Sequence, residues 1–355
     1  MEDLALRSSF WSNKRVLITG HTGFKGAWLS IWLQRLGSII AGYALPAATK
    51  PSLFELADVS VEMQSEIGDV RNLEHLSRFV DGFRPDIIIH MAAQSLVRPS
   101  YIDPVETFAT NVMGTVNILE AARQSDVRAV VNVTTDKCYE NLERVEGYRE
   151  DEPLGGHDPY SASKGCSEIV TSSYRRSFSL GVASARAGNV IGGGDWAQDR
   201  LIPDMMRSFM ADEVLTIRNP ASTRPWQHVL EPLRGYLLLA EHLYEHAPQY
   251  AEAWNFGPDD EDARPVEWLA DRVCDLWGPP ARWSNTADED PLHEAGFLRL
   301  NCDKAKNRLA WQPRMTLEQA LAWTVAWYKG FQQGDDVRTL TEQQITNYEA
   351  GKDLS

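Results

Sequence analysis

A glycine-rich turn between an apolar strand and a helix is the strongest constraint on the fold. The predicted strand at 15–19 (RVLIT) runs directly into GHTGFKG at 20–26, and the apolar sequence AWLSIWLQRL follows. At such a junction glycines permit a tight turn, close approach of the backbone to a pyrophosphate, and close packing of helix on strand. The helix N-terminus favours the same anion. The alternative is a glycine-rich turn that binds no ligand. The residues that we predict to bind a dinucleotide here are Gly20, Gly23, Phe24, Lys25 and Gly26.

Apolar strands alternate with amphipathic helices through the first half of the chain. The predicted strands lie at 15–19, 38–45, 86–90, 129–134 and 181–187, and the predicted helices at 25–36, 73–83, 105–125 and 161–178. Continuous apolar strands separated by helices are typical of a parallel sheet that is covered on both faces. Right-handed crossovers then give an α/β, doubly wound (Rossmann) fold that binds its ligands at the carboxyl ends of the strands.

After about residue 188 this alternation gives way to turn-rich segments with helices near 202–210, 231–246 and 266–277. We therefore predict a dinucleotide-binding Rossmann domain over 1–187, with returning segments near 226–257. A smaller C-terminal substrate-binding lobe is expected over 188–225 and 258–355. The polar stretch from about Gln332 is expected to form a peripheral helix or a tail.

Composition limits the partners of the chain. Its 35 Lys and Arg against 50 Asp and Glu give a formal net charge of −15, which argues against a nucleic-acid binder but leaves room for a small anion held by a few arginines. No run approaches the ~20 apolar residues of a membrane span, and the N-terminus lacks signal-peptide order. Four cysteines without CxxC spacing suggest neither a metal site nor disulfides. We expect a cytoplasmic protein without a membrane partner or metal.

Two motifs supply a candidate catalytic centre. The predicted fifth strand ends in VTTDK, which places Thr135, Asp136 and Lys137 at the carboxyl edge of the sheet. In YSASK, Tyr160 and Lys164 share one helix face. The Lys164 ammonium and a positive nicotinamide ring can together lower the pKa of the phenol from about 10 and make Tyr160 a usable base. Thr135 can hydrogen-bond the same substrate hydroxyl. The YxxxK pattern alone is common on helix surfaces, and it becomes specific only in this combination.

The second strand does not decide between NAD and NADP. Its end reads YALPAATK, with no acid that could bind the adenosine ribose. Asp69, after a short probable third strand, can accept a hydrogen bond from the adenine amino group instead. The alternative, a loop acid at a helix N-terminus, has almost equal support.

The segments TGHTGFKG, HMAAQ, NVMGT, TTDK, YSASK and AGNVIGGG together resemble the extended short-chain dehydrogenase/reductase family, in its nucleotide-sugar branch. The resemblance covers nearly the whole chain. DKCYEN and GGGDW with DRLIPD resemble the subgroup that dehydrates CDP-D-glucose. This resemblance implies NAD as cofactor, oxidation of the glucose at C4, loss of water across C5 and C6, and return of the hydride to C6. The product would be CDP-4-dehydro-6-deoxy-D-glucose.

Other functions remain open from the sequence. They are a dehydratase or 4-epimerase for another nucleotide sugar, and a catalytically silent dinucleotide-binding protein. The presence of Thr135, Tyr160 and Lys164 speaks against a silent protein. Asp136 speaks against simple epimerisation, which needs no acid for a leaving group.

The resemblance also implies roles for the catalytic residues. Tyr160 would remove the proton of the C4 hydroxyl, and Asp136 would protonate the departing C6 hydroxyl, which requires a raised pKa. Lys137 stands where most such dehydratases carry Glu, and the subgroup shares this lysine. It is either the base at C5 or an electrostatic stabiliser of the enolate.

Arginines are the candidates for the substrate diphosphate, because guanidinium groups match phosphate oxygens. They are Arg200, Arg218 and Arg224, although a solvated surface charge is an even alternative for Arg218. Trp196 and Trp226 can stack on the base or belong to the core. The further residues predicted for NAD are Val70, Ala92, Ala93, Gln94 and Asn111, and those for the nucleotide sugar are Ser95, Arg98, Asn189 and Leu201. The resemblance implies a homodimer or homotetramer formed through the helices at 105–125 and 161–178.

Overall fold

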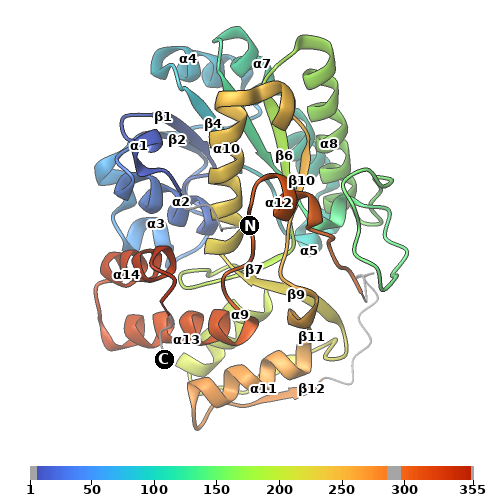
Figure 1. Cartoon of the computed structure of the whole chain (residues 1–355). Coiled ribbons are helices and arrows are strands. Elements are labelled where there is room, and N and C mark those ends of the chain that lie inside the picture. Colours follow the sequence, from blue (N-terminus) through green and yellow to red (C-terminus); the bar gives the residue numbers. More distant parts are fainter. Residues whose placement is uncertain (1–5, 286–296, 353–355) are drawn as a thin grey trace.

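The computed structural model describes residues 6–285 and 297–352. Its main sheet has seven parallel strands in the order β10-β6-β5-β4-β1-β2-β3 (Figure 1). The chain runs outward from β1 to β3 and returns to β4 on the other side of β1, which confirms the doubly wound fold. The strands are β1 (Arg15–Thr19), β2 (Ile39–Ala44), β3 (Gln64–Ile67), β4 (Ile87–His90), β5 (Ala129–Val133), β6 (Val182–Ala187) and β10 (Ala253–Phe256).

Helices cover both faces of this sheet, as Figure 1 shows. Along β1, Val16 and Ile18 belong to one apolar core and Leu17 to the other, and all three are fully buried. Because side chains alternate across a strand, a sheet that is covered on both faces favours apolar residues at successive positions. The helices are α2 (Phe24–Arg35) and α10 (Leu230–Tyr250) on one face, and α4 (Leu73–Phe83), α7 (Gly114–Gln124) and α8 (Pro159–Phe178) on the other.

The single helix predicted at 105–125 is wrong in detail. The structure has α6 (Pro104–Phe108), a π-helical turn η2 (Ala109–Met113) and then α7. Within the wide turn, Asn111 accepts a hydrogen bond from the Gln94 amide (2.9 Å) and donates one to the Gln94 carbonyl (2.9 Å). A π-turn often marks a functional position, and periodicity alone does not reveal it.

A second group of elements lies below the main sheet in Figure 1. Strands β7 (Asn189–Ile191), β9 (Thr223–His228) and β11 (Ala263–Pro265) form one small sheet, and β8 (Leu215–Ile217) pairs with β12 (Trp283–Asn285). The helices of this group are α9 (Leu201–Met210), α11 (Val266–Trp277) and α13 (Leu317–Gln333). The shorter helices elsewhere are α1 (Ser8–Trp11), α3 (Leu53–Leu56), η1 (Val59–Glu62), α5 (Val97–Ile102), η3 (Asp136–Cys138), η4 (Asp260–Asp262) and α12 (Asp303–Arg308).

The polar C-terminal stretch forms a helix, α14 (Val337–Glu349), which packs against α2. Tyr348 donates a hydrogen bond to the buried Glu231 (2.9 Å), and Trp32 donates one to Glu349 (2.7 Å). The last helix therefore contacts the half of the chain that carries the glycine-rich turn. The predicted boundary between the two lobes stays a prediction, and residues 286–296 of the predicted lobe lie outside the described residues.

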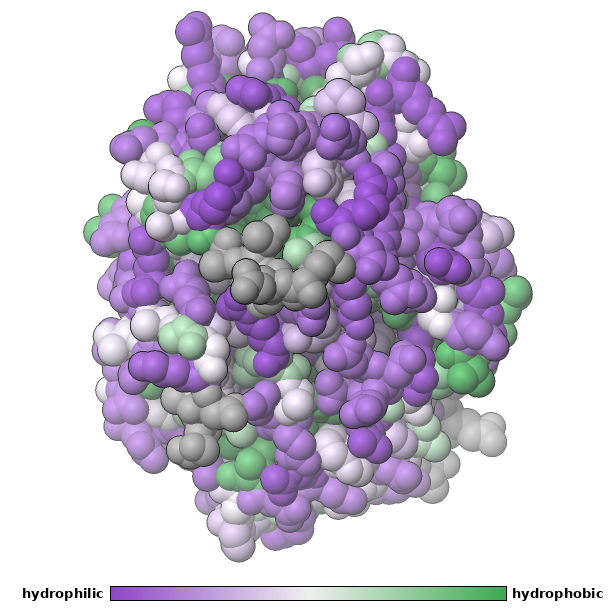
Figure 2. Space-filling view, in the orientation of Figure 1, coloured by the Kyte–Doolittle hydropathy of each residue, from purple (hydrophilic) through white to green (hydrophobic). Residues whose placement is uncertain are grey.

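The face shown in Figure 2 is mostly hydrophilic, with small hydrophobic areas among the hydrophilic ones. Among the residues that the structure describes, no helix is both long and apolar enough to cross a membrane.

Candidate active site

A cavity of about 340 Å³ lies where the carboxyl ends of β5 and β6 meet the second group of elements. It brings together side chains from segments far apart in the chain. From the predicted catalytic set it is lined by Thr135, Asp136, Lys137 and Tyr160. From the predicted ligand set it is lined by Lys25, Ser95, Arg98, Asn189, Arg200, Leu201, Arg218 and Arg224.

The glycine-rich turn has the shape of a phosphate cradle. Gly20 has a φ of +79°, and a Cβ there would lie 2.8 Å from the Ala92 nitrogen. A Cβ at Gly26 would lie 2.2 Å from the Gly20 carbonyl oxygen. Gly23 is the N-cap residue of α2, and because it has no side chain it accepts no hydrogen bond from the first N–H groups of the helix. These features fit the pyrophosphate of a dinucleotide.

The side chain of His21, the second residue of the turn, packs against β2 and β3. Its Nε2 hydrogen-bonds the Ser65 hydroxyl (2.7 Å), and a Cβ at Gly42 would overlap its ring. Burial lowers the pKa of His21 to about 4, so the ring is neutral near pH 7. His21 thus ties the turn to β2 and β3 without adding charge, and the sequence offers no signal for this role.

The loop after β4 lies against the turn. The Ala92 amide donates to the Thr19 hydroxyl (3.2 Å), and Asn111, which holds Gln94, also donates to Ser163 on α8 (2.8 Å). The predicted cofactor residues Ala92, Ala93 and Gln94 therefore lie on the loop beside the turn, and Asn111 is hydrogen-bonded to this loop through Gln94. Val70 is buried in the apolar core nearby.

Asp69 is engaged by a neighbour. One of its oxygens accepts from the Arg71 backbone and the Arg71 Nε (2.9 Å each), and the hydrogen bonds from Arg71 hold the pKa of Asp69 below its usual value. Arg71 also pairs with Glu106. These contacts fit the alternative, in which Asp69 is an acid on the loop before a helix. The contact of Asp69 with adenine stays a prediction.

Asp136 is the most deeply buried acid in the cavity lining. It begins η3 directly after β5, is 2% exposed, and accepts a hydrogen bond from the Thr135 hydroxyl (3.0 Å). Burial raises the pKa of Asp136, although the charges of Lys137 and Arg224 oppose this. A raised pKa is what a general acid needs in order to hold its proton near neutral pH.

Tyr160 and Lys164 lie one turn apart on α8, which Asp158 caps by accepting from the Ser161 amide (2.9 Å). The Lys164 ammonium donates to the Val133 carbonyl at the end of β5 (3.1 Å). Burial lowers the pKa of Lys164 to about 8 and raises the pKa of Tyr160 to about 12. The hydrogen bond with Thr135 and the charge of Arg200 lower the pKa of the phenol, but burial outweighs them, and Lys164 is not among the groups that lower it. The expected lowering therefore rests on the nicotinamide charge.

Arg200 lines the cavity and links two segments around it. It donates to Asp195 (3.0 Å) and to Ser95 (3.1 Å), which joins the loop after β4 to the segment before α9. Asp195 is absent from the predicted set, although its place in GGGDW, close to Arg200, was a signal. Lys25 adds a second cation, and burial lowers its pKa to about 8, helped by the charges of Arg200 and Lys164.

Of the remaining aromatic and arginine candidates, Arg218 and Trp226 line the cavity and Trp196 does not. Arg218 pairs with the exposed Asp199 (3.6 Å) while also lining the cavity. Trp196 packs edge-on against Tyr328 in the core. Trp226 is buried and lines the cavity.

The sequence profile of the NAD dependent epimerase/dehydratase family matches residues 16–257. The chain belongs to this family. Among curated relatives, a CDP-glucose 4,6-dehydratase of Salmonella typhimurium is 52% identical over 350 residues, which cover 96% of this chain and 97% of that protein. A dTDP-glucose 4,6-dehydratase of Haemophilus influenzae is 26% identical over 338 residues, covering 88% of this chain and 97% of that protein.

Solved structures agree with the fold. A dTDP-glucose 4,6-dehydratase of Streptomyces venezuelae, crystallised with NAD, superposes with a TM-score of 0.79 at 25% identity, covering 90% of this chain and 98% of that one. A UDP-glucose 4-epimerase of Thermotoga maritima superposes with a TM-score of 0.79 at 20% identity, covering 89% of this chain and 99% of that one. At 20% identity, this second likeness concerns the fold alone.

Two glycines of the turn separate ligand binding from packing. A Cβ at Gly23 would meet the Gly20 oxygen at 3.4 Å, an ordinary contact, so Gly23→Ala should leave thermal unfolding unchanged. It should nevertheless weaken NAD binding by about tenfold or more, ~1.4 kcal/mol, because it blocks the close approach of the pyrophosphate. Gly26→Ala should weaken binding and also cost about 1–3 kcal/mol of stability through overpacking.

Calorimetric titration with NAD and thermal unfolding measure the two effects. Gly82→Ala is the matched control, since nothing lies within 4 Å of a Cβ at that position of α4. Wild-type NAD affinity in the Gly23→Ala protein would contradict the assignment of the turn.

Proposed function

We propose that the chain is a lyase with internally recycled NAD that converts CDP-D-glucose into CDP-4-dehydro-6-deoxy-D-glucose. The observation that carries the dehydration is the buried Asp136, with its raised pKa, in the same cavity as Tyr160. An epimerase at C4 has no leaving group and needs no such acid. The relative that is 52% identical along nearly the whole chain supports CDP-glucose as the substrate.

The side chains divide the steps as follows. When bound, NAD supplies the acceptor for the C4 hydride and the donor of the hydride to C6. Tyr160 takes the proton of the C4 hydroxyl, and Thr135, next to Asp136 in the lining, holds that hydroxyl by a hydrogen bond. The resulting ketone acidifies the proton at C5. Asp136 protonates the C6 hydroxyl as it leaves as water. Lys137 either takes the C5 proton or stabilises the enolate while another base takes that proton.

The anionic substrate suits a cavity that is locally cationic in an acidic protein. A diphosphate carries negative charge, and Lys25, Arg200, Arg218 and Arg224 all line the cavity. Local positive potential in a cleft outweighs a distant net charge of −15. We assign Ser95, Arg98, Asn189 and Leu201 to the walls around the nucleotide sugar.

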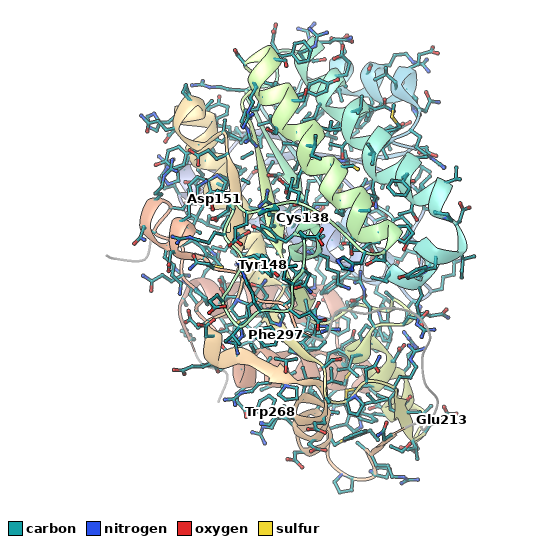
Figure 3. All side chains as sticks on the ribbon, turned by 90° about the vertical axis from the view of Figure 1, so that its right-hand side faces the viewer. Cys138, Tyr148, Asp151, Glu213, Trp268 and Phe297 are labelled. Carbon is teal, nitrogen blue, oxygen red and sulfur yellow. The ribbon has the colours of Figure 1, made fainter. Side chains whose placement is uncertain are left out.

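We further propose a homodimer or homotetramer in the cytoplasm. Large apolar side chains are exposed beside α8, on elements that pack against it: Ile102 is 85% exposed, Val105 78%, Met113 50%, and Ile169 on α8 itself 60%. Figure 3 shows the green and teal helices α8 and α7 side by side on this face of the molecule. Four free cysteines in the described residues suit a reducing compartment.

The substrate is tested by incubating the purified protein and NAD with CDP-, UDP-, dTDP- and GDP-glucose. A 4-keto-6-deoxy sugar, detected by its chromophore in alkali, is expected with CDP-glucose. Product from another sugar nucleotide but not from CDP-glucose would contradict the assignment.

The role of Lys137 is tested by Lys137→Met. The variant should still oxidise C4, so NADH absorbance should rise, but it should stall before elimination because neither a C5 base nor the enolate-stabilising charge remains. Tyr160→Phe is the control that should block oxidation itself. Full turnover by Lys137→Met would refute the role.

The oligomer is tested by Val105→Asp, which places a charge in the proposed interface. The mass from light scattering should fall toward the 39.9 kDa of one chain. Val61→Asp is a matched control, because Val61 on η1 is also 78% exposed. Dissociation by both variants, or by neither, would argue against this interface.

A further inference from the structure

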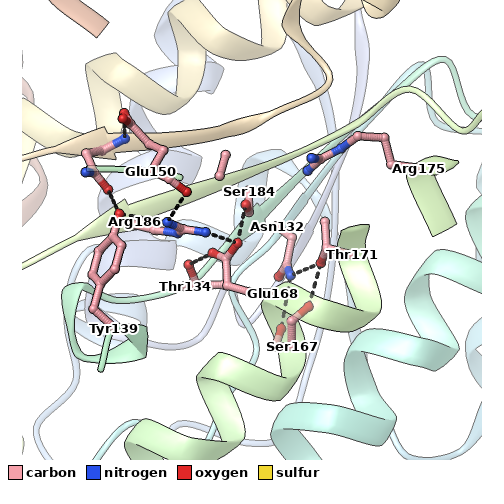
Figure 4. A network of polar contacts seen from close by, with 12 residues as sticks. Asn132, Thr134, Tyr139, Glu150, Ser167, Glu168, Thr171, Arg175, Ser184 and Arg186 are labelled. Carbon is pink, nitrogen blue, oxygen red and sulfur yellow. Dashed lines mark hydrogen bonds and ion pairs between the residues drawn. The ribbon is translucent and has the colours of Figure 1, made fainter. Parts of the chain in front are cut away.

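A buried ionic network joins α8 to β6 and to the end of β5 (Figure 4). Its centre is the carboxylate of Glu168 on α8, which is 4% exposed. Glu168 accepts hydrogen bonds from the Thr134 hydroxyl, from the Ser184 hydroxyl (2.6 Å) and from the Arg186 guanidinium (2.8 Å). Arg186 also donates to the Tyr139 hydroxyl (2.7 Å). Although burial favours the neutral acid, Arg186 and these hydrogen bonds hold the pKa of Glu168 below its usual value.

A buried ion pair of this kind is weak evidence for stability, because desolvation offsets much of the attraction. The position of Glu168 suggests another reason for its presence. Lys164, one helical turn earlier, holds the Val133 carbonyl, and Glu168 holds the Thr134 hydroxyl. Two successive turns of α8 are therefore hydrogen-bonded to two successive residues at the end of β5, Val133 and Thr134. The next residues along the chain are Thr135 and Asp136, both in the cavity lining.

We propose that Glu168 is a positioning residue of the dehydration: its carboxylate fixes the end of β5 so that Thr135 and Asp136 face the substrate, and it places a negative charge one helical turn from Lys164. This inference rests on the proposed function for the identity of the reaction. Glu168 does not line the cavity and acts only through these neighbours.

The electrostatic part of the proposal follows from the groups around Lys164. Burial lowers its pKa to about 8, and the charge of Glu168 is the first interaction that opposes this, followed by the Cys138 thiol on η3. Lys25 on α2 is a like charge, and His90 on β4, whose pKa burial lowers to about 3, is neutral near pH 7. The ammonium is present at low pH and is lost as pH rises through about 8. Without the Glu168 charge this loss should occur at lower pH.

The test is Glu168→Gln, measured in two ways. In the ligand-free protein, NMR titration of the Lys164 side chain, assigned with Lys164→Met, should show the midpoint lowered by about one pH unit. In turnover of CDP-glucose, the high-pH limb of kcat should shift in the same direction. Glu168→Asp keeps the charge and should restore both values toward wild type.

Loss of folding is controlled by a second variant. Glu168→Gln leaves the buried Arg186 without its carboxylate, so Glu168→Gln with Arg186→Met removes both charges and should recover thermal stability. The double variant should still show the lowered Lys164 midpoint. Ser184→Ala removes only a neutral hydrogen bond to the same carboxylate and should leave the midpoint unchanged.

The outcomes separate the two hypotheses. An unchanged Lys164 midpoint in Glu168→Gln and in the double variant overturns the inference, whatever the wild-type enzyme does with CDP-glucose. A lowered midpoint with no wild-type turnover of CDP-glucose supports the electrostatic part and overturns the proposed function. A uniform drop in kcat with no movement of the pH limb would reduce Glu168 to a purely structural residue.

Discussion

The contact between the start of α2 and the ends of β1 and β4 is the constraint on which the rest of the molecule depends. Gly20 and Gly26 meet there at distances that no Cβ would permit. Because of this contact, α2 begins at the point of the sheet where the strand order reverses, and the N-terminus of a helix at such a point favours an anion. The loop after β4 lies beside this point, and the ends of β5 and β6 line the cavity with the side chains of the candidate reaction.

Removal from water then shapes the chemistry of those side chains. Burial raises the pKa of Asp136 and of Tyr160 and lowers the pKa of Lys164. The same cause thus moves the pKa of Asp136 in the direction that a general acid needs and lowers the pKa of Lys164 to about 8. It also leaves the phenol as the group that most needs the positive charge of the cofactor. The Glu168 carboxylate, shielded in its own ionic network, partly offsets the effect on Lys164.

Patterns within a few residues predicted much of the fold and of the candidate site, because the burial of a strand and the geometry of a turn depend on neighbouring residues. The apolar runs that became β1, β4 and β5, and the turn at 20–26, are recognised from burial on two faces and from glycine geometry within a few residues. The π-turn that carries Asn111 has the composition of an ordinary helix and was not distinguishable from one. Asp195 enters the site through its ion pair with Arg200, and Asp69 meets Arg71 through a turn whose geometry the sequence does not show.

The sequence by itself determined the doubly wound class, the glycine-rich turn and the two motifs that end in Lys137 and Lys164, because each depends on residues adjacent along one strand or one helix face. The tertiary structure decided which charges share the cavity and how deeply Asp136 is buried. It also decided that Glu168 on α8 accepts a hydrogen bond from Thr134 at the end of β5. Desolvation and pairing are properties of the whole environment of a group. They arise from segments more than a hundred residues apart, such as Ser95 and Arg200, and only the folded chain brings these segments together.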